Sequence, residues 1–141
     1  MANVKAAVYA HLKTKTGVTG LIGTSDNMRA YPGRVPDNAG LPYVQVHDIS
    51  GTHEQMLSAR AGVVDGRVQI DCWGGTPLEA YNVADAIRLA MDHIAYGTSV
   101  GGVTIQGSQA LDTSEVNDIE TGLEAADRYG YRVEVNVWYQ E

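Results

Sequence analysis

Hydrophobic and polar residues alternate most regularly near the end of the sequence, in YGYRVEVNVWYQ, residues 129–140. In an extended chain, the Val side chains and most Tyr side chains of this segment share one face, and mostly polar residues occupy the other. This period of two predicts a β-strand with one covered face. The same period, in shorter or weaker form, predicts three more strands at 42–50, 66–73 and 101–111.

An N-terminal helix is predicted over residues 1–15, where apolar residues recur at three- and four-residue spacing. We expect Gly17 and Gly20 to end it, because glycine is a poor helix former. Residues 27–41 are rich in Pro and Gly and are expected to form an extended loop before the first strand.

A second helix is predicted to begin after Thr76 and to end by Gly97. Pro77 suits the first helical position, and Glu79 stands three residues beyond Thr76. This arrangement is a capping box, in which the Thr and Glu side chains accept hydrogen bonds from backbone N–H groups that the helix leaves free.

The expected order of elements is therefore helix, strand, strand, helix, strand, strand. Strands adjacent in sequence favour antiparallel pairing, which predicts the α+β class: a mostly antiparallel four-stranded sheet with helices packed on one face. A chain of 141 residues can bury one moderate core, so we expect a single domain spanning residues 1–141. Two connections, 51–65 and 112–127, are longer than hairpins require and are expected to be loops.

The second of these connections holds most of the net charge. The formal charge of the chain is −7, and residues 112–127 contain six acidic residues and no Lys or Arg. The six are Asp112, Glu115, Asp118, Glu120, Glu124 and Asp127. The remainder is near neutral, which argues against a general nucleic-acid-binding surface. An acidic run of this kind is typical of a solvated face or a docking surface.

Other bulk features predict a soluble protein of a reducing cytoplasm. The single cysteine, Cys72, cannot form an internal disulfide. Residues 1–15 are too polar for a signal peptide, and no apolar run reaches the length of a membrane span. We therefore expect no association with a membrane.

Cys72 is the first candidate for chemistry, but a nucleophilic cysteine needs a lowered pKa and a base within hydrogen-bond reach. The period of two places Cys72 with Val68 and Ile70 on the face expected to be buried, and His47 on the opposite face of its own strand. We interpret Cys72 as a small buried hydrophobic residue. The adjoining WGGT, residues 73–76, could bind an anion at the helix start, but it has no Lys or Arg close by and is better explained as a strand-to-helix turn.

His47, Asp48 and His53 are a second group of candidates, because two histidines and an acid can bind zinc. Their spacing matches no common zinc motif, and the sequence shows no Ser-His-Asp arrangement. A small enzyme built on these three residues is kept as an alternative. The residues otherwise predict no catalytic site, no metal and no cofactor.

Trp73 and Trp138 both fall on the polar face of their strands. Exposed tryptophans are enriched at protein interfaces, so we predict that these two residues and the acidic residues of 112–127 belong to subunit or partner interfaces. The alternative is that helices cover this face, or that each indole ring covers a loop at the end of its strand.

Four segments carry a further signal when taken in order. They are the N-terminal VKAAVYAHL, the loop RAYPGRVP followed by LPYVQV, the strand and helix RVQIDCWGGTPLEAYNVADAIRLAM, and the final VNVWYQ. Together they resemble the tail-terminator, or tail-completion, proteins of long-tailed bacteriophages and related prophages, over nearly the whole chain. The resemblance implies a compact α+β fold and a family pattern without catalytic residues.

The resemblance further implies a structural role in the virion. Proteins of this family assemble as rings, commonly hexamers, at the head-proximal end of the tail. The ring stops growth of the tail tube and presents a surface for the neck of the filled head. The implied partners are the tail-tube protein and a neck or head-completion protein, with DNA passing through the lumen without specific binding. The implied location is the virion tail, after assembly in the host cytoplasm.

Two other interpretations stay open: a neck or connector-completion protein on the portal side, and a stand-alone cytoplasmic adaptor. The acidic segment 112–127 maps to no motif of the family. It could line the lumen, where negative charge repels DNA, or dock on a basic surface of the tail tube or neck.

Overall fold

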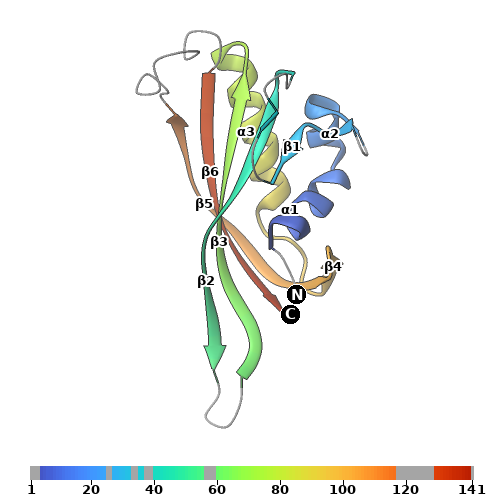
Figure 1. Cartoon of the computed structure of the whole chain (residues 1–141), viewed down its shortest axis with the longest axis vertical. Helices are drawn as coiled ribbons and strands as arrows, with labels where there is room; N and C mark the ends of the chain where they lie inside the picture. The colour runs from blue at the N-terminus through green and yellow to red at the C-terminus, as the bar shows by residue number, and fades with distance from the viewer. Residues whose placement is uncertain are drawn as a thin grey trace.

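In the part of the chain that the structure describes, six strands form one twisted sheet and three helices pack on one of its faces (Figure 1). The computed structural model describes residues 4–24, 27–32, 35–36, 40–55, 60–116 and 129–140, without the side chains of 50–55, 60–63 and 116. The helices are α1 (Val4–Lys13), α2 (Thr16–Ile22) and α3 (Pro77–Met91). The strands are β1 (Ala30–Tyr31), β2 (Tyr43–Gln55), β3 (Arg60–Gly74), β4 (Thr98–Val100), β5 (Val103–Val116) and β6 (Tyr129–Gln140).

The strand order is β1-β2-β3-β6-β5-β4, with β1 parallel to β2 and the other neighbouring pairs antiparallel. The α+β class expected from the sequence is confirmed, whereas the expected four-stranded sheet is wrong. The four expected strands correspond to β2, β3, β5 and β6, and the described sheet also has β1 and β4 at its edges. These two strands have two and three residues, too few to show a period of two, and pairing with a longer strand holds them in place.

The N-terminal segment folds as two helices. The second, α2, contains both Gly17 and Gly20, which the sequence suggests as residues that end helical structure. That expectation is wrong because burial outweighs helix propensity here. Val18 and Ile22 of α2 are buried in the core, and tertiary packing supplies most of the stability of a short helix.

Strands extend into both connections that were expected to be loops. β2 and β3 continue into segment 51–65 and form a long hairpin that extends past the helices (Figure 1). β5 continues into segment 112–127, so the first acidic residues of that segment lie in a strand. β-Bulges hide these extensions from sequence analysis. Register shifts after Asp48 in β2 and after Ala110 in β5 move the later residues to the other face and interrupt the period of two.

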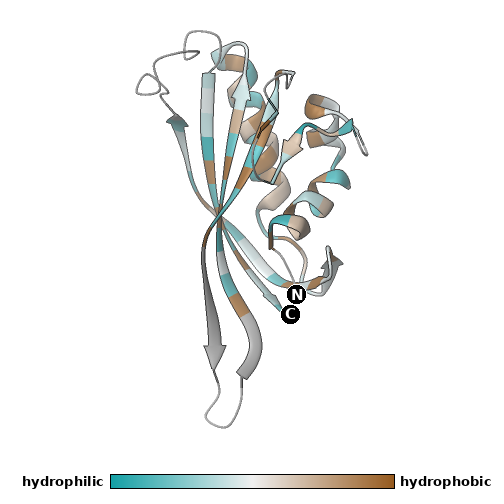
Figure 2. Cartoon of the chain, in the orientation of Figure 1, coloured by the Kyte–Doolittle hydropathy of each residue, from teal (hydrophilic) through white to brown (hydrophobic). Residues whose placement is uncertain are grey.

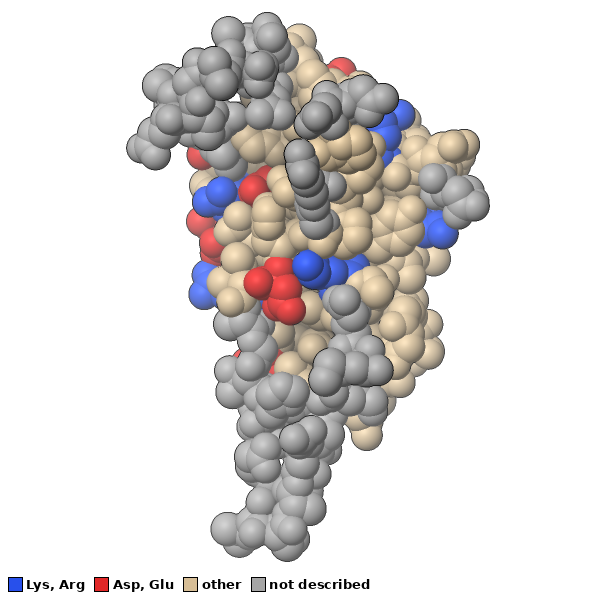
Figure 3. Space-filling model, in the orientation of Figure 1, with Lys and Arg blue, Asp and Glu red and all other residues tan. Residues whose placement is uncertain are grey.

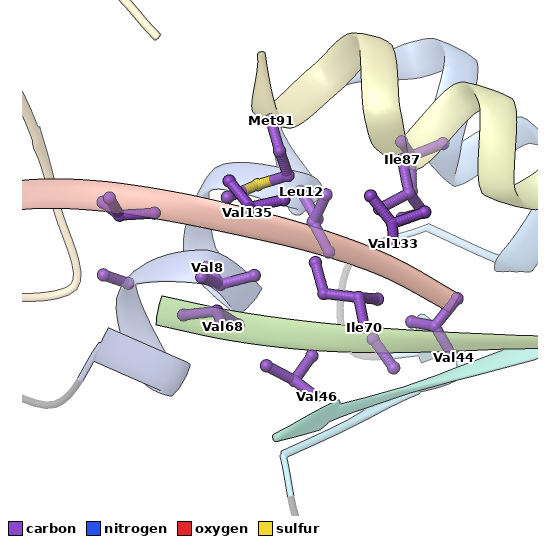
Figure 4. Close-up of a cluster of buried hydrophobic side chains, with 14 of the residues drawn as sticks. Val8, Leu12, Val44, Val46, Val68, Ile70, Ile87, Met91, Val133 and Val135 are labelled. Carbon is purple, nitrogen blue, oxygen red and sulfur yellow. The ribbon is translucent and has the colours of Figure 1, made fainter. Parts of the chain in front are cut away.

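The core lies between the sheet and the helices, where the strand and helix patterns meet, and hydrophobic residues gather there on both layers (Figure 2). The Tyr- and Val-bearing face of β6 is its buried face, as predicted: Val133 and Val135 are fully buried. Helix α3 packs on β3, β5 and β6, and α1 packs near β2 and β4. Ten core side chains are labelled in Figure 4: Val8, Leu12, Val44, Val46, Val68, Ile70, Ile87, Met91, Val133 and Val135.

Candidate assembly surfaces

The face of the sheet that points away from the three helices, here called the helix-free face, carries polar side chains that contact one another. The Arg132 Nε donates to the Asp71 Oδ1 over 2.9 Å, and the His47 Nε2 lies 3.4 Å from the Asp71 Oδ2. The Arg67 Nη2 donates to the Glu134 Oε2 over 2.6 Å. These contacts bridge β2 to β3 and β3 to β6, and they pair charges within the face. In the view of Figure 3, basic and acidic residues likewise lie beside one another on the surface.

Asp71 is a buried carboxylate at the centre of this network, with 6% of its surface exposed. A buried charge is costly unless it is paired and hydrogen-bonded. Arg132 and His47 approach it from the two neighbouring strands, and the Gln69 Nε2 lies 3.4 Å from both of its oxygens. Asp71 is therefore a residue that ties three strands together.

The three residues of the enzyme alternative have different surroundings. His47 contacts Asp71 on the helix-free face, whereas Asp48, the next residue of the strand, is exposed. The side chain of His53 lies outside the described ones. Within the described ranges, no group of three or more His, Cys, Asp or Glu residues is placed to hold a metal ion.

Cys72 is fully buried, and its Sγ lies 4.0 Å from the carbonyl oxygen of Ile70. Burial raises the pKa of the Cys72 thiol far above its usual range, and the neighbouring charge of Asp71 raises it further. A thiol that stays protonated is a poor nucleophile. The interpretation of Cys72 as a small buried hydrophobic residue is therefore confirmed.

Gly74, the last residue of β3, and Gly75 form a strand-to-helix turn before α3, as predicted. The Thr76 Oγ1 accepts a hydrogen bond from the Glu79 N–H over 3.1 Å, and the Glu79 Oε1 accepts one from the Gly75 N–H over 2.8 Å. The backbone of Gly74 packs closely against the first turn of α3, where a Cβ would lie 2.7 Å from the Ala80 nitrogen. The turn thus uses donors that an anion would need.

The premise that Trp73 is exposed is wrong, because only 8% of its surface is exposed. Trp73 pairs across the strands with Gly130, where a Cβ would lie only 2.7 Å from the indole ring. The missing side chain of Gly130 leaves room for the ring against the sheet. Trp138 is half-buried, beside Gly107. A role of either tryptophan at an interface stays a prediction.

The acidic segment begins within β5. Asp112 and Glu115 are exposed, and they pair across the strands with Glu134 and Tyr131. The other four acidic residues, Asp118, Glu120, Glu124 and Asp127, lie outside the described residues. An interface role for the segment therefore rests on its charge and on the exposure of its first two acids.

Two edges of the sheet remain open among the described residues, one on β2 and one on β5. β1 pairs with two residues of β2, and β4 pairs with three residues of β5, so most of each outer edge has no neighbouring strand. A large aliphatic residue lies exposed at a bulge in each strand: Ile49 of β2 is 51% exposed and Leu111 of β5 is 43% exposed. Sequence analysis missed both edges because strand order depends on pairing between distant segments.

The outward side of α3 is a further surface that sequence analysis missed. Leu78, Tyr81 and Leu89 are exposed there, and the Tyr81 ring meets Tyr131 of β6 edge to face, with ring centroids 5.7 Å apart. A cleft of about 360 Å³ between α2 and α3 includes Leu89 and Lys15 in its lining. The signal was present in the sequence, because Leu78 and Leu89 lie outside the apolar stripe of the helix.

No helix in the described part of the chain has both the length and the apolar character to cross a membrane. The fold, with its open edges, paired surface charges and exposed aliphatic and aromatic side chains, has the features of a structural assembly protein. The sequence matches the family described as tail completion protein gp17 over residues 6–140, and the chain belongs to that family. The resemblance inferred from the sequence is confirmed, and it gives the protein a structural role in a phage-like virion tail.

The fold is also similar to that of a chain in a solved structure entitled "Virion of native gene transfer agent (GTA) particle". The two chains are 17% identical, the alignment covers 98% of this chain and 95% of that chain, and the TM-score is 0.72. At this level of identity, the similarity shows a shared fold. None of the curated proteins matches the sequence.

Proposed function

We propose that this tail completion protein closes the head-proximal end of the tail as a hexameric ring of identical subunits. In that position it stops growth of the tail tube, offers the surface to which a neck or head-completion protein joins, and lets DNA pass through its lumen without specific binding. It catalyses no reaction. The observation that carries the proposal is the match to the tail completion family over residues 6–140, nearly the whole chain.

The surfaces of the subunit support this proposal. A ring with head-to-tail contacts needs two different surfaces on each subunit, and the open edges of β2 and β5 are two such surfaces. A partner protein needs a third, and Leu78, Tyr81 and Leu89 offer exposed aliphatic and aromatic groups on α3. We assign this third surface to the tail tube or the neck.

The proposed function can be tested with virus-like particles assembled in the absence of this protein. Without a terminating ring, tails should be irregular in length and should fail to join heads. Adding the purified protein should restore joining, and particle images should show a ring at the head-proximal end whose subunit number native mass measurement gives. Tails of normal length that lack only heads would instead indicate a neck or connector protein on the portal side. A protein that stays monomeric both in solution and on tails would contradict the ring.

Within this function, we assign the acidic segment 112–127 to the lumen of the ring, where it repels passing DNA. Repulsion explains a run of one charge sign without requiring a complementary partner. Docking on a basic surface of the tail tube or neck is the competing role. It differs in salt dependence, because exposed charges farther apart than about 10 Å are largely screened at roughly 0.1 M salt.

The two roles are separated by neutralising the acids and measuring capping and DNA ejection independently. The variant replaces all six with Asn or Gln: Asp112, Glu115, Asp118, Glu120, Glu124 and Asp127. Normal capping with slowed ejection is expected for a lumen, whereas lost capping would indicate docking. Asp48→Asn, an exposed acid outside the segment, is the control and should alter neither. If the variant with all six substitutions changes neither capping nor DNA ejection, both roles are wrong.

A further inference from the structure

We propose that the ring closes through the backbone: the open edge of β2 in one copy pairs antiparallel with the open edge of β5 in the next copy. This inference rests on the proposed ring and names the contact that builds it. The partner at each edge is a second copy of this chain.

The first half of the contact is the outer edge of β2. The Val44 N–H donates to the Arg29 carbonyl oxygen over 2.9 Å, on the side where β1 lies. Backbone groups alternate in direction along a strand, so Val46 and Asp48 present their N–H and C=O groups on that same side. β1 ends at Tyr31, which pairs with Gln45 and so still lies beside Val46. Beyond that pair, the outward backbone groups of Asp48 have no neighbouring strand among the described residues.

The second half is the outer edge of β5 beyond Ala110. Up to that point the residues after α3 cover the edge: the His93 N–H donates to the Ser108 carbonyl oxygen over 3.1 Å, and the Asp92 Oδ1 accepts from the Ala110 N–H over 3.0 Å. After the bulge at Leu111, the alternation turns the backbone groups of Thr113 to this edge. The described part of the chain offers no partner for them there.

Strand direction decides how these edges can meet. The pairs β2–β3, β3–β6 and β6–β5 are all antiparallel, so β2 and β5 run in opposite directions, as their arrows show in Figure 1. A rotation about an axis along the strands preserves the direction of each strand. It therefore brings β5 of one copy beside β2 of the next in antiparallel orientation. A head-to-tail contact of this kind closes into a ring when its rotation does.

The position of the open stretches adds a requirement. On β2 the open stretch runs toward the tip of the β2–β3 hairpin, whereas on β5 it lies at the opposite end of the sheet (Figure 1). Pairing therefore needs neighbouring copies to be staggered along the strands. Tilting the strands relative to the axis produces such a stagger in any closed sheet.

The side chains at the two edges favour pairing with another chain, because they lack the residues that usually prevent such pairing. A monomer usually blunts an open edge with Pro or Lys, and neither residue occurs in 46–55 or 111–116. The bulges at Ile49 and Leu111 would blunt the edges, but blunting needs no large aliphatic group. Both bulges nevertheless expose one. We assign these two side chains to the joint between copies, where pairing removes them from water.

Proline substitution tests the use of each edge. Proline removes a backbone N–H and is tolerated in an edge strand where that N–H faces solvent. Asp48→Pro and Thr113→Pro should therefore leave a folded subunit, by circular dichroism and thermal unfolding, that forms no ring on tails. The matched controls Asp48→Ala and Thr113→Ala keep the N–H and should form rings like the wild type. Folded proline variants that assemble normally would overturn the inference.

Mixing the two proline variants sharpens the test. Each retains one intact edge, and the two intact edges are complementary, so the mixture should give two-subunit complexes and no ring. If only one of the two prolines blocks assembly, that edge binds a different virion protein and pairing between copies is wrong. If the wild-type protein forms no ring, the proposed function is wrong. If both proline variants form rings like the wild type, only this inference is wrong.

Cross-linking gives an answer that does not depend on how well the proline variants fold. A double variant, Ile49→Cys with Leu111→Cys, is assembled on tails and treated with a short bifunctional maleimide. Head-to-tail neighbours should give a ladder of covalent multimers up to the size of the ring. Each single variant should give none, and Cys72 is buried and should not react. Double-variant rings without the ladder would contradict the contact.

Discussion

The two faces of the sheet are built from the same strands, but they carry different kinds of residue. On the helix-covered face, neighbouring strands contribute Val44, Ile70 and Val133, all with no exposed surface. On the helix-free face, the adjacent positions contribute charges such as Arg67 and Glu134 that bind each other near solvent. The covered face buries apolar side chains away from water. The helix-free face keeps charged side chains near water, where they pair with one another.

This difference between the two faces is visible along a single strand. Ile70 and Cys72 pack in the core, while Asp71 between them joins the polar network. Burial of apolar surface supplies most folding free energy, whereas exposed ion pairs contribute little. We therefore expect substitutions of residues buried on the covered face to change stability most, and substitutions of exposed residues on the helix-free face to change it least.

The largest effect should come from the covered face. Ile70→Ala removes most of a fully buried side chain and should lower the free energy of unfolding by about 2–5 kcal/mol, from lost transfer energy and a residual cavity. Denaturant unfolding measures it. Ile49→Ala, the same substitution at an exposed site, should cost less than about 0.5 kcal/mol. Equal losses at both sites would remove the distinction between the faces.

A second effect should arise where the helix-free face is packed tightly. Gly130→Ala places a Cβ about 2.7 Å from the Trp73 ring and should cost about 1–3 kcal/mol, because the ring is buried and has to move. Gly107→Ala is the matched control on β5, since its Cβ would lie at an ordinary 3.7 Å from Trp138. Thermal unfolding of both variants makes the comparison. A stable Gly130→Ala variant would show that Trp73 is not confined.

Local patterns in the sequence predicted the parts of the fold that depend on local physics. The alternation in 129–140 identified the buried face of β6, because each strand side chain is forced to one of two faces. Thr76 and Glu79 identified the start of α3 through hydrogen bonds within one turn. The period of two along its strand was enough to predict that Cys72 lies in the core.

The remaining features depend on contacts between distant segments. Trp73 is covered because pairing brings Gly130 beside it, and no local pattern reveals that register. α2 forms although it contains two glycines, which are poor helix formers, because Val18 and Ile22 are buried in the core. The open edges of β2 and β5 follow from strand order, so the candidate contact between subunits could not be found before the sheet was known.

A smaller effect should come from the one buried histidine of the described helices. His11 is buried in the helix layer, where its Nε2 lies 2.9 Å from the Ala90 carbonyl oxygen and its Nδ1 has no hydrogen-bond partner among the described residues. Burial lowers the pKa of His11 below the usual 6.5, against the opposing hydrogen bond to Ala90, and the charge of Lys15 lowers it further. The unfolded chain therefore binds a proton more readily as the pH falls below 6.5, so stability should fall there and be fully present above it.

Unfolding measured between about pH 7.5 and about pH 5.5 tests this effect. His11→Gln removes the titrating ring and should flatten the decline in stability over that range, whatever its cost at neutral pH. His93→Gln, at an exposed histidine, should keep the wild-type slope. If both variants decline like the wild type, the pH dependence arises elsewhere.

The smallest effect should be the coupling between Arg67 and Glu134, the ion pair on the helix-free face. Their side chains are 46% and 27% exposed, so water competes for both, and a double-mutant cycle with Arg67→Ala and Glu134→Ala should give about 0.2–1 kcal/mol. Added salt should reduce that value. The exposed pair of Arg88 with Asp85 on α3, with 38% and 40% exposure, is the matched control and should give a similar value. A coupling above about 2 kcal/mol for Arg67 and Glu134 alone would mean that the exposed charges of the helix-free face also help to hold the subunit together, because exposed pairs do not reach that strength. The contrast between the two faces in their contribution to stability would then fail at this exposed ion pair.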